Sequence, residues 1–251
     1  FETISVSDTG IVTVNILAPT SGTHRAFVIL DIVDDGNIEN NIGSISITVR
    51  YPFGVVLMNE FFALPDSNET EFVEIIPQQA ANVKDWSIMD SGGSKGIFPN
   101  LDLAPFTYCL VTDDSTFLDL IPDTSVLIMP ENGLPGLNNT SETIYILDHT
   151  ESVIDSLRYD ETWPLMSSRS TEKYRTSASS NNVKNWGISV GDEGQTPGYQ
   201  NSLFFSDFPS KGTVEFSPDP FSPDGDGIDD LLTLTFSLPY LEAAIRWEVI
   251  D

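Results

Sequence analysis

The sequence predicts an all-β protein built from short antiparallel strands, and three observations lead to this fold class. Apolar and polar residues alternate with a period of two in many short segments, such as EFVEI at 71–75 and ETIYILD at 142–148. Clusters of Gly, Pro, Asn and Asp separate these segments, as expected for turns between strands. Helical periodicity is almost absent, and only TFLDLIP at 116–122 is expected to form a turn or two before Pro122 ends it.

Residues 1–52 contain four period-two segments, TISVS, IVTVNIL, HRAFVILDIV and ISITVRY. Four strands are too few to close a sandwich, so we expect the C-terminal part of an Ig-like domain. The segment 26–49, AFVILDIVDDGNIENNIGSISITV, resembles the last hairpin of bacterial cell-adhesion-related Ig-like repeats, which place an Asn-rich turn before the final strand.

Residues 53–204 are expected to form one complete sandwich domain. Six fragments occur there in order: VLMNE (56–60), EFVEI (71–75), DWSI (85–88), IDSLRY (154–159), NW (185–186) and TPGYQN (196–201). Together they resemble the lamin tail domain, an Ig-like β-sandwich of nuclear lamins and of many bacterial secreted proteins. STEK at 170–173 departs from the bacterial pattern, which often has Arg after the Glu. The polar span 165–185 is expected to be a long surface excursion.

Residues 205–251 are expected to be a linker and the N-terminal part of a second Ig-like domain. FSPDGDGIDD at 221–230, followed by LTLTFSLP, resembles the C-terminal Ig-like module of bacterial surface proteins related to the flagellar hook cap. The chain starts without Met and stops within the period-two segment IRWEVID. We therefore expect it to be a piece of a longer secreted or cell-surface protein, with incomplete units on both sides of the sandwich.

The charge of the chain restricts its partners. Lys and Arg number 11 against 38 Asp and Glu, for a net charge of -27. A surface this acidic repels phosphate backbones and anionic lipids, which argues against nucleic-acid binding. No apolar run is long enough to span a bilayer, so direct membrane insertion is not expected. The single Cys109 lies in the apolar run TYCLV and predicts a buried hydrophobe.

The Asp-rich loop at 219–230 is the sharpest chemical signal. Asp224 and Asp226 are two residues apart, Asp230 follows four later, and intervening glycines permit a sharp bend. Ca²⁺ takes six to eight hard oxygen ligands, and these carboxylates with the carbonyl oxygen of Ile228 would supply part of that set. The alternative is an ordinary Asp-Gly turn with solvated carboxylates.

Catalysis finds little support in the sequence. Glu60, Glu71 and Glu74 suggest paired carboxylates, but strand alternation places Glu71 and Glu74 on opposite faces. We expect Asn59 and Glu60 to bond exposed backbone at the sandwich edge instead. No nucleophile elbow, phosphate loop or zinc-ligand pattern occurs. The sequence therefore predicts a protein that is not an enzyme.

The tryptophans divide into two groups. Trp86 and Trp186 fall on core positions of the lamin tail pattern, so the resemblance implies that they pack inside. Trp163 precedes a polar loop and is expected to be exposed. With Tyr159 and Tyr174 it would form a platform on which a sugar ring could stack. The alternative is a Trp-Pro turn packed against the sandwich.

These observations predict a non-catalytic structural, adhesive or targeting module of a secreted or cell-surface bacterial multidomain protein. The alternative is a carbohydrate- or surface-polymer-binding module attached to a hydrolase. Expected partners are other domains of the same polypeptide and a surface glycan or protein. The step from fold to function rests on analogy with the families named above.

Overall fold

The computed structural model describes residues 13, 20–31, 36–205 and 213–237, and it confirms the all-β prediction. Three short 3-10 helices and no α-helix occur among the described residues. The chain divides into two compact units, Phe1–Pro52 and Phe53–Asp251. No helix in the described ranges is long and apolar enough to cross a membrane.

The first unit contains one antiparallel hairpin. Strand β1 (Gly22–Ile29) pairs with β2 (Ile42–Val49) over their whole lengths, and η1 (Ile38–Asn41) lies in the connection. Phe27, Ile29 and Ile42 share one face of the hairpin, because Phe27 pairs with Ser44 and Ile29 with Ile42, and all three are exposed. The two predicted strands before residue 20 lie outside the described residues.

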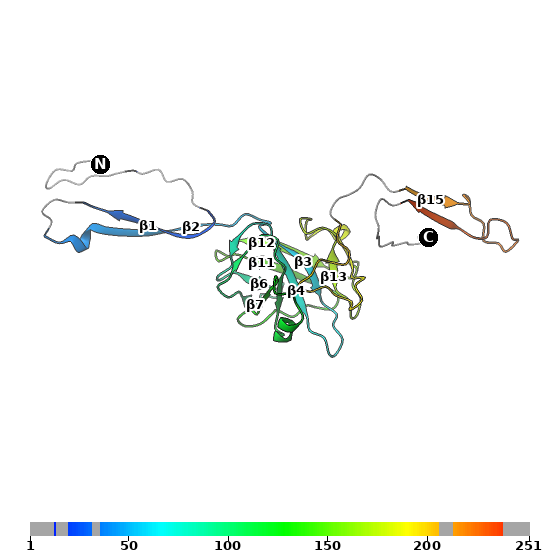
Figure 1. The fold of residues 1–251 in the computed structure, drawn as a ribbon, viewed down its shortest axis with the longest axis horizontal. Helices are drawn as coiled ribbons and strands as arrows, with labels where there is room; N and C mark the ends of the chain where they lie inside the picture. The colour runs from blue at the N-terminus through cyan, green and yellow to red at the C-terminus, as the bar shows by residue number, and fades with distance from the viewer. Residues whose placement is uncertain (1–12, 14–19, 32–35, 206–212, 238–251) are drawn as a thin grey trace. The chain divides into compact units, whose positions relative to one another are not determined.

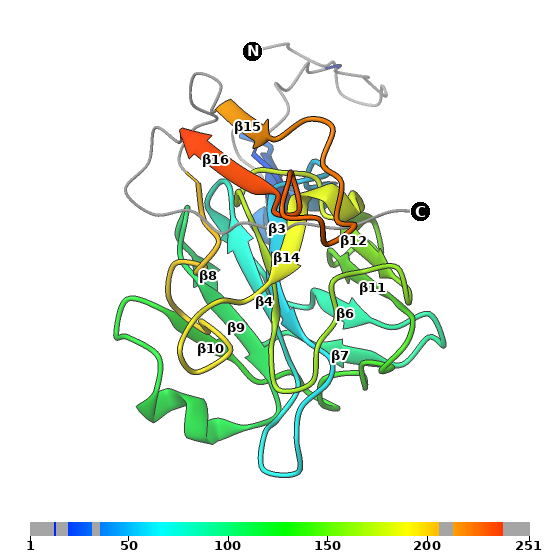
Figure 2. The ribbon, with the colours of Figure 1, turned by 90° about the vertical axis from the view of Figure 1, so that its right-hand side faces the viewer.

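The second unit contains a sandwich of two sheets (Figure 1). Its larger sheet has the order β10-β9-β4-β3-β13-β14 and its smaller sheet the order β12-β11-β6-β7. Figure 2 shows β3, β4, β9 and β10 together in the larger sheet and β6, β7, β11 and β12 in the smaller. The strands of the larger sheet are β3 (Val56–Phe62), β4 (Phe72–Pro77), β9 (Cys109–Thr112), β10 (Val126–Ile128), β13 (Thr171–Lys173) and β14 (Trp186–Ile188).

The remaining strands complete the sandwich. The smaller sheet consists of β6 (Ser87–Met89), β7 (Lys95–Ile97), β11 (Glu142–Leu147) and β12 (Val153–Tyr159), and β5 (Ala81–Asn82) pairs separately with β8 (Asp102–Leu103). Neighbouring strands run antiparallel except β9 and β10, which are parallel.

Aromatic side chains fill the space between the two sheets. Phe61 on β3 stacks on Tyr159 on β12, with ring centroids 5.0 Å apart. Trp163 and Trp186 approach Phe61 edge-on, at 6.3 Å and 5.5 Å. Trp86 is completely buried. The predicted core positions of Trp86 and Trp186 are therefore confirmed, and each large aromatic ring supplies much of the apolar area removed from water.

The outer face of the larger sheet is covered as well. The 3-10 helix η2 (Ser115–Asp119) places Phe117 against Phe62, Phe72 and Leu110, with Ile121 and Leu127 around them. Phe62 and Phe72 are buried for this reason, and every other residue of β3 and β4 is buried as well. The expected short helical turn near 116–122 is present, and Asp114 caps it by accepting the Thr116 N–H.

The burial of individual residues confirms the expectation for Cys109 and corrects the one for residues 165–185. Cys109 is fully buried on β9, and its burial raises the pKa of the thiol to about 12. The expected surface excursion over 165–185 is wrong at its centre. Strand β13 (Thr171–Lys173) is entirely buried between β3 and β14, because its polar side chains are bonded inside the fold.

A last hairpin pairs β15 (Thr213–Ser217) with β16 (Thr233–Ser237). Val214 lies opposite Phe236 and Phe216 opposite Leu234, so the strand alternation places all four on one face. These four side chains are exposed. The loop between the two strands carries the predicted calcium ligands.

Candidate functional site

Three glutamates lie side by side on the larger sheet, and we call them the carboxyl row. Glu60 on β3 pairs with Glu74 on β4, and Glu172 on β13 pairs with Glu60 from the other side. All three side chains are completely buried. Sequence spacing alone could not reveal this row, because two of its three members are more than a hundred residues apart.

Segment 196–203 covers the row and supplies its hydrogen-bond donors. Glu60 accepts the Thr196 N–H at 2.9 Å through Oε1. Glu74 accepts the Gly198 N–H at 2.6 Å. Glu172 accepts the Leu203 N–H at 3.0 Å. Each carboxyl of the row thus holds a different part of the same covering segment onto the sheet.

The hydroxyl of Thr196 lies between two carboxyls of the row. Its Oγ1 lies 3.1 Å from Oε2 of Glu60 and 3.0 Å from Oε1 of Glu172. A hydroxyl has one hydrogen to donate, so two full hydrogen bonds form when one of the carboxyls is protonated and donates to the hydroxyl. Burial and the nearby Glu172 raise the pKa of Glu60 to about 7, and burial with the nearby Glu60 raises the pKa of Glu74.

Burial of the row favours protonation of Glu60 and Glu74 over their charged forms. The ion pair found within the described ranges joins Lys95, on a strand of the smaller sheet, to Glu151, and it includes no carboxyl of the row. Bringing three unpaired carboxylates into a low-dielectric interior is expensive, and a buried carboxyl takes up a proton instead.

Two buried asparagines connect the row to the strand backbones. The Asn201 amide donates to the carbonyl oxygens of Asn59, at 3.0 Å, and of Lys173, at 2.9 Å. The Asn59 amide donates to Asn201 at 2.6 Å and to Glu74 at 2.8 Å. The expectation that Asn59 and Glu60 lie at the sandwich edge is wrong, because β3 has β4 on one side and β13 on the other.

A second buried polar group lies on the opposite face of β13. The Lys173 ammonium donates to the Ser180 hydroxyl at 2.9 Å. The same hydroxyl donates to the carboxyl of Asp155, on β12, at 2.5 Å. Asp155 also accepts the Met58 N–H at 2.8 Å. Burial lowers the pKa of Lys173 to about 8 and raises the pKa of Asp155. This chain of bonds ties the two sheets together.

The predicted aromatic platform is not formed. Tyr159 is completely buried and Trp163 is 9% exposed, because both pack around Phe61 in the core between the sheets. Neither ring offers a face to a ligand, and the alternative of a Trp-Pro turn packed on the sandwich describes Trp163 correctly. Tyr174 is the one member that remains partly exposed.

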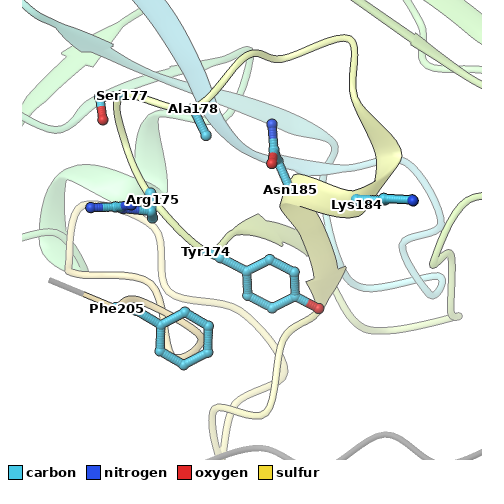
Figure 3. A pocket seen from close by; sticks show the side chains of 7 residues that line it. All are labelled: Tyr174, Arg175, Ser177, Ala178, Lys184, Asn185 and Phe205. Carbon is cyan, nitrogen blue, oxygen red and sulfur yellow. The ribbon is translucent and has the colours of Figure 1, made fainter. Parts of the chain in front are cut away.

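Tyr174 lines a pocket of about 520 Å³ (Figure 3). Its ring stacks on Phe205, with centroids 5.5 Å apart and planes 14° apart. The backbone joins three segments here, since Tyr174 donates its N–H to the carbonyl of Asn185 and accepts the N–H of Phe205. The other lining residues are Arg175, Ser177, Ala178 and Lys184. Lys184 and Asn185 both belong to the 3-10 helix η3 (Val183–Asn185).

The predicted calcium ligands come together at the loop between β15 and β16. Oxygen atoms of Asp224, Asp226 and Asp230 lie within 4.8 Å of one another. Asp230 accepts the N–H groups of Gly225 and Gly227, both at 2.7 Å, and both glycines have positive φ angles, 80° and 87°.

Ile228 belongs to the same turn. It donates its N–H to Asp226 at 2.7 Å. The loop therefore presents three carboxylates in one place, with lone pairs beyond those used for the turn itself. A hard cation such as Ca²⁺ is the metal that this oxygen-only donor set suits.

Comparison with known proteins found no match for this chain, either among protein-family models or among curated proteins. The resemblance to the lamin tail domain therefore remains a prediction from the sequence.

Proposed function

We propose that this chain is a non-catalytic structural, adhesive or targeting module of a secreted or cell-surface multidomain protein. The observation that supports it most is the carboxyl row. The acidic side chains on the outer face of the larger sheet bond the covering segment 196–203 instead of facing an opening. They stabilise the fold, as a structural or spacing module requires.

The location and the family belong to the same proposal. An acidic chain whose Asp loop offers the oxygen ligands that Ca²⁺ prefers suits an extracytoplasmic setting, where Ca²⁺ is abundant. The order of the six lamin-tail-like fragments supports a bacterial lamin tail domain as the central sandwich. In this proposal, Ca²⁺ bound by Asp224, Asp226 and Asp230 stiffens the last hairpin.

A second candidate function is binding of a carbohydrate or surface polymer on behalf of an attached hydrolase. The pocket beside Tyr174 favours it, because stacked aromatic rings and nearby polar groups line a space large enough for a small ligand. This pocket replaces the platform expected around Trp163.

A bead assay separates the two candidates. Beads coated with the protein are passed in flow over cellulose, chitin and peptidoglycan, with albumin-coated beads as the control. A structural spacer gives retention equal to albumin, whereas a polymer-binding module is retained and loses retention in Tyr174→Leu. Soluble sugars or peptides released from any of the three polymers faster than in buffer would contradict the non-catalytic proposal.

A further inference from the structure

We propose that the side chains of Lys173 and Asp155 condense with each other, so that an amide bond joins β13 of the larger sheet to β12 of the smaller sheet. The proposal goes beyond both candidate functions, because it concerns a covalent modification that the chain carries out on itself. It rests on the burial of the two side chains, on the contacts that they share and on the chemistry of an amine beside a carboxyl group.

The fold brings the two side chains to a common contact inside the sandwich. Lys173 is completely buried and Asp155 is 1% exposed. The Ser180 hydroxyl lies between them, because its Oγ is 2.9 Å from Nζ of Lys173 and 2.5 Å from Oδ2 of Asp155. The Lys173 side chain is a flexible four-carbon stem, and rotation about its last bonds would bring Nζ from Ser180 onto the carboxyl carbon. Two reactants held together in this way react without the cost of a bimolecular encounter.

The surroundings of Lys173 favour the neutral amine, which is the form that attacks a carboxyl carbon. An ammonium has three hydrogens to donate. Within the described part of the chain, Nζ has the Ser180 hydroxyl as its hydrogen-bond partner, and the ring of Trp186 lies 5.3 Å away. Burial lowers the pKa of Lys173 to about 8 and raises the pKa of Asp155. Transfer of one proton from the ammonium to the carboxylate then gives an amine and a carboxylic acid, the pair that condenses.

The carboxyl of Asp155 is oriented for this attack. Its Oδ2 accepts the Met58 N–H at 2.8 Å and the Ser180 hydroxyl at 2.5 Å. Two donors directed at one oxygen stabilise the negative charge that develops there when a nucleophile adds to the carbon. Because Oδ2 already accepts two hydrogen bonds, the proton of the acid belongs on Oδ1, which makes Oδ1 the leaving oxygen.

The reaction balances without a co-reactant. The lone pair of Nζ forms the C–N bond to the carboxyl carbon of Asp155, and the bond from that carbon to Oδ1 breaks. Oδ1 leaves as water with its own hydrogen and one hydrogen from Nζ. The second Nζ hydrogen stays on the amide, and Oδ2 becomes the amide oxygen that still accepts the Met58 N–H. The unlinked pair described above is the precursor, and neither group titrates once the bond has formed.

Mass spectrometry of the folded protein, after incubation near the pKa of Lys173, tests the proposal. We expect the intact chain to lose the mass of one water molecule. When the product is unfolded and digested, trypsin should fail to cut after Lys173, and residues 96–158 should appear joined to residues 170–175. The parent protein alone gives this map, so the test does not depend on whether a variant folds. An unchanged mass together with normal cleavage after Lys173 would overturn the proposal.

Variants assign the loss of water to these two side chains, and thermal melts show whether each variant is folded. Lys173→Met should keep the full mass, whereas Asp155→Asn should lose ammonia in place of water. Ser180→Ala removes one of the two donors to Oδ2 and should slow bond formation about 100-fold. The matched control Lys184→Met, at an exposed lysine, should lose water at the rate of the parent. Loss of water that persists in Lys173→Met, for example through ring closure at an Asp-Gly sequence, would also overturn the proposal.

Discussion

Two groups of three acidic side chains within the described residues can be compared, and they differ in burial and in their place in the fold. Glu60, Glu74 and Glu172 are completely buried on three adjacent strands. The carboxylates of Asp224, Asp226 and Asp230 gather on one loop, where Asp224 and Asp226 are exposed. Water and ions reach the loop freely, whereas the row has only the protein around it.

The surroundings decide which partner relieves the repulsion. In the row, desolvation disfavours the charged form, so a proton is the available partner. On the loop, solvent screens the charges and a divalent cation can enter with its remaining waters. The burial of an acidic cluster therefore decides whether it takes up a proton or a cation. We expect the row to respond to pH and the loop to respond to Ca²⁺. The predictions below test this separation, from the largest effect to the smallest.

The largest effect is expected from Asn201→Leu, which keeps the size of the side chain and removes its hydrogen bonds. The carbonyls of Asn59 and Lys173 and the amide of Asn59 each lose a partner in the interior. At roughly 1–3 kcal/mol for each unsatisfied buried group, we expect a loss of about 4 kcal/mol in the free energy of unfolding, measured in urea.

Gln200→Leu is the matched control, because Gln200 is the exposed neighbour of Asn201. Its effect should stay within about 0.5 kcal/mol. A small effect of Asn201→Leu would mean that the covering segment contributes little to stability, and the row would then not be a structural element.

The second effect is a dependence of stability on pH. The pKa of Glu60 is raised from 4.5 to about 7 in the folded protein. Folded and unfolded states are both protonated below pH 4.5, so the stabilising contribution is complete there and is lost as the pH rises toward 7. We expect the free energy of unfolding to fall by about 3 kcal/mol between pH 4.5 and 7.5. Lys173 does not obscure this window, because its lowered pKa of about 8 acts at higher pH.

Glu60→Gln should make this dependence shallower, and the raised pKa values of Glu74 and Asp155 should maintain the remaining slope. The glutamine amide donates to Thr196 at every pH, as the protonated carboxyl does, so the variant should be the more stable protein at pH 7.5. Glu161→Gln, an exposed site, should keep the slope of the parent. A parent protein whose stability rises between pH 4.5 and 7 would contradict a protonated row.

The smallest effect is local and concerns Ca²⁺. If the loop binds the ion, amide hydrogen exchange in β15 and β16 should slow about 10- to 100-fold when free Ca²⁺ exceeds its Kd by the same factor. Asp224→Asn/Asp226→Asn should abolish this protection, and a chelator should reverse it. The melting temperature of the sandwich should not respond to Ca²⁺. A response of the sandwich that disappears in Glu60→Gln would show that the row, too, takes a cation.

The sequence predicted the elements whose signal is local. Period-two alternation located β3, β4, β11 and β12, the run before Pro122 located η2, and the lamin-tail-like positions of Trp86 and Trp186 were placed in the core. The Asp loop was also predicted as a set, because its ligands lie within seven residues of one another and its glycines permit the turn.

The carboxyl row could not be predicted, because it depends on register between distant strands. A shift in the pairing between Met58 and Glu60 changes which residue of β3 faces Glu74. Strand β13 was missed because Thr, Glu and Lys are residues usually found at the surface. Their burial becomes favourable only through bonds to residues such as Thr196 and Ser180. Trp163 was misplaced for a related reason, since its partner Phe61 lies about a hundred residues earlier.

The donors of segment 196–203 have a consequence for the order in which this domain is made. The hydrogen bond that Glu60 accepts from Thr196 joins residues 136 positions apart, and the bond from Asn59 to Asn201 spans a similar length of chain. Neither bond can form until the later residue has been synthesised. Chains grow from the N-terminus, so strands β3 and β4 are synthesised long before the groups that complete their outer face. The sandwich should finish folding only when its last residues have left the ribosome, and a nascent chain stalled before residue 196 should remain sensitive to protease.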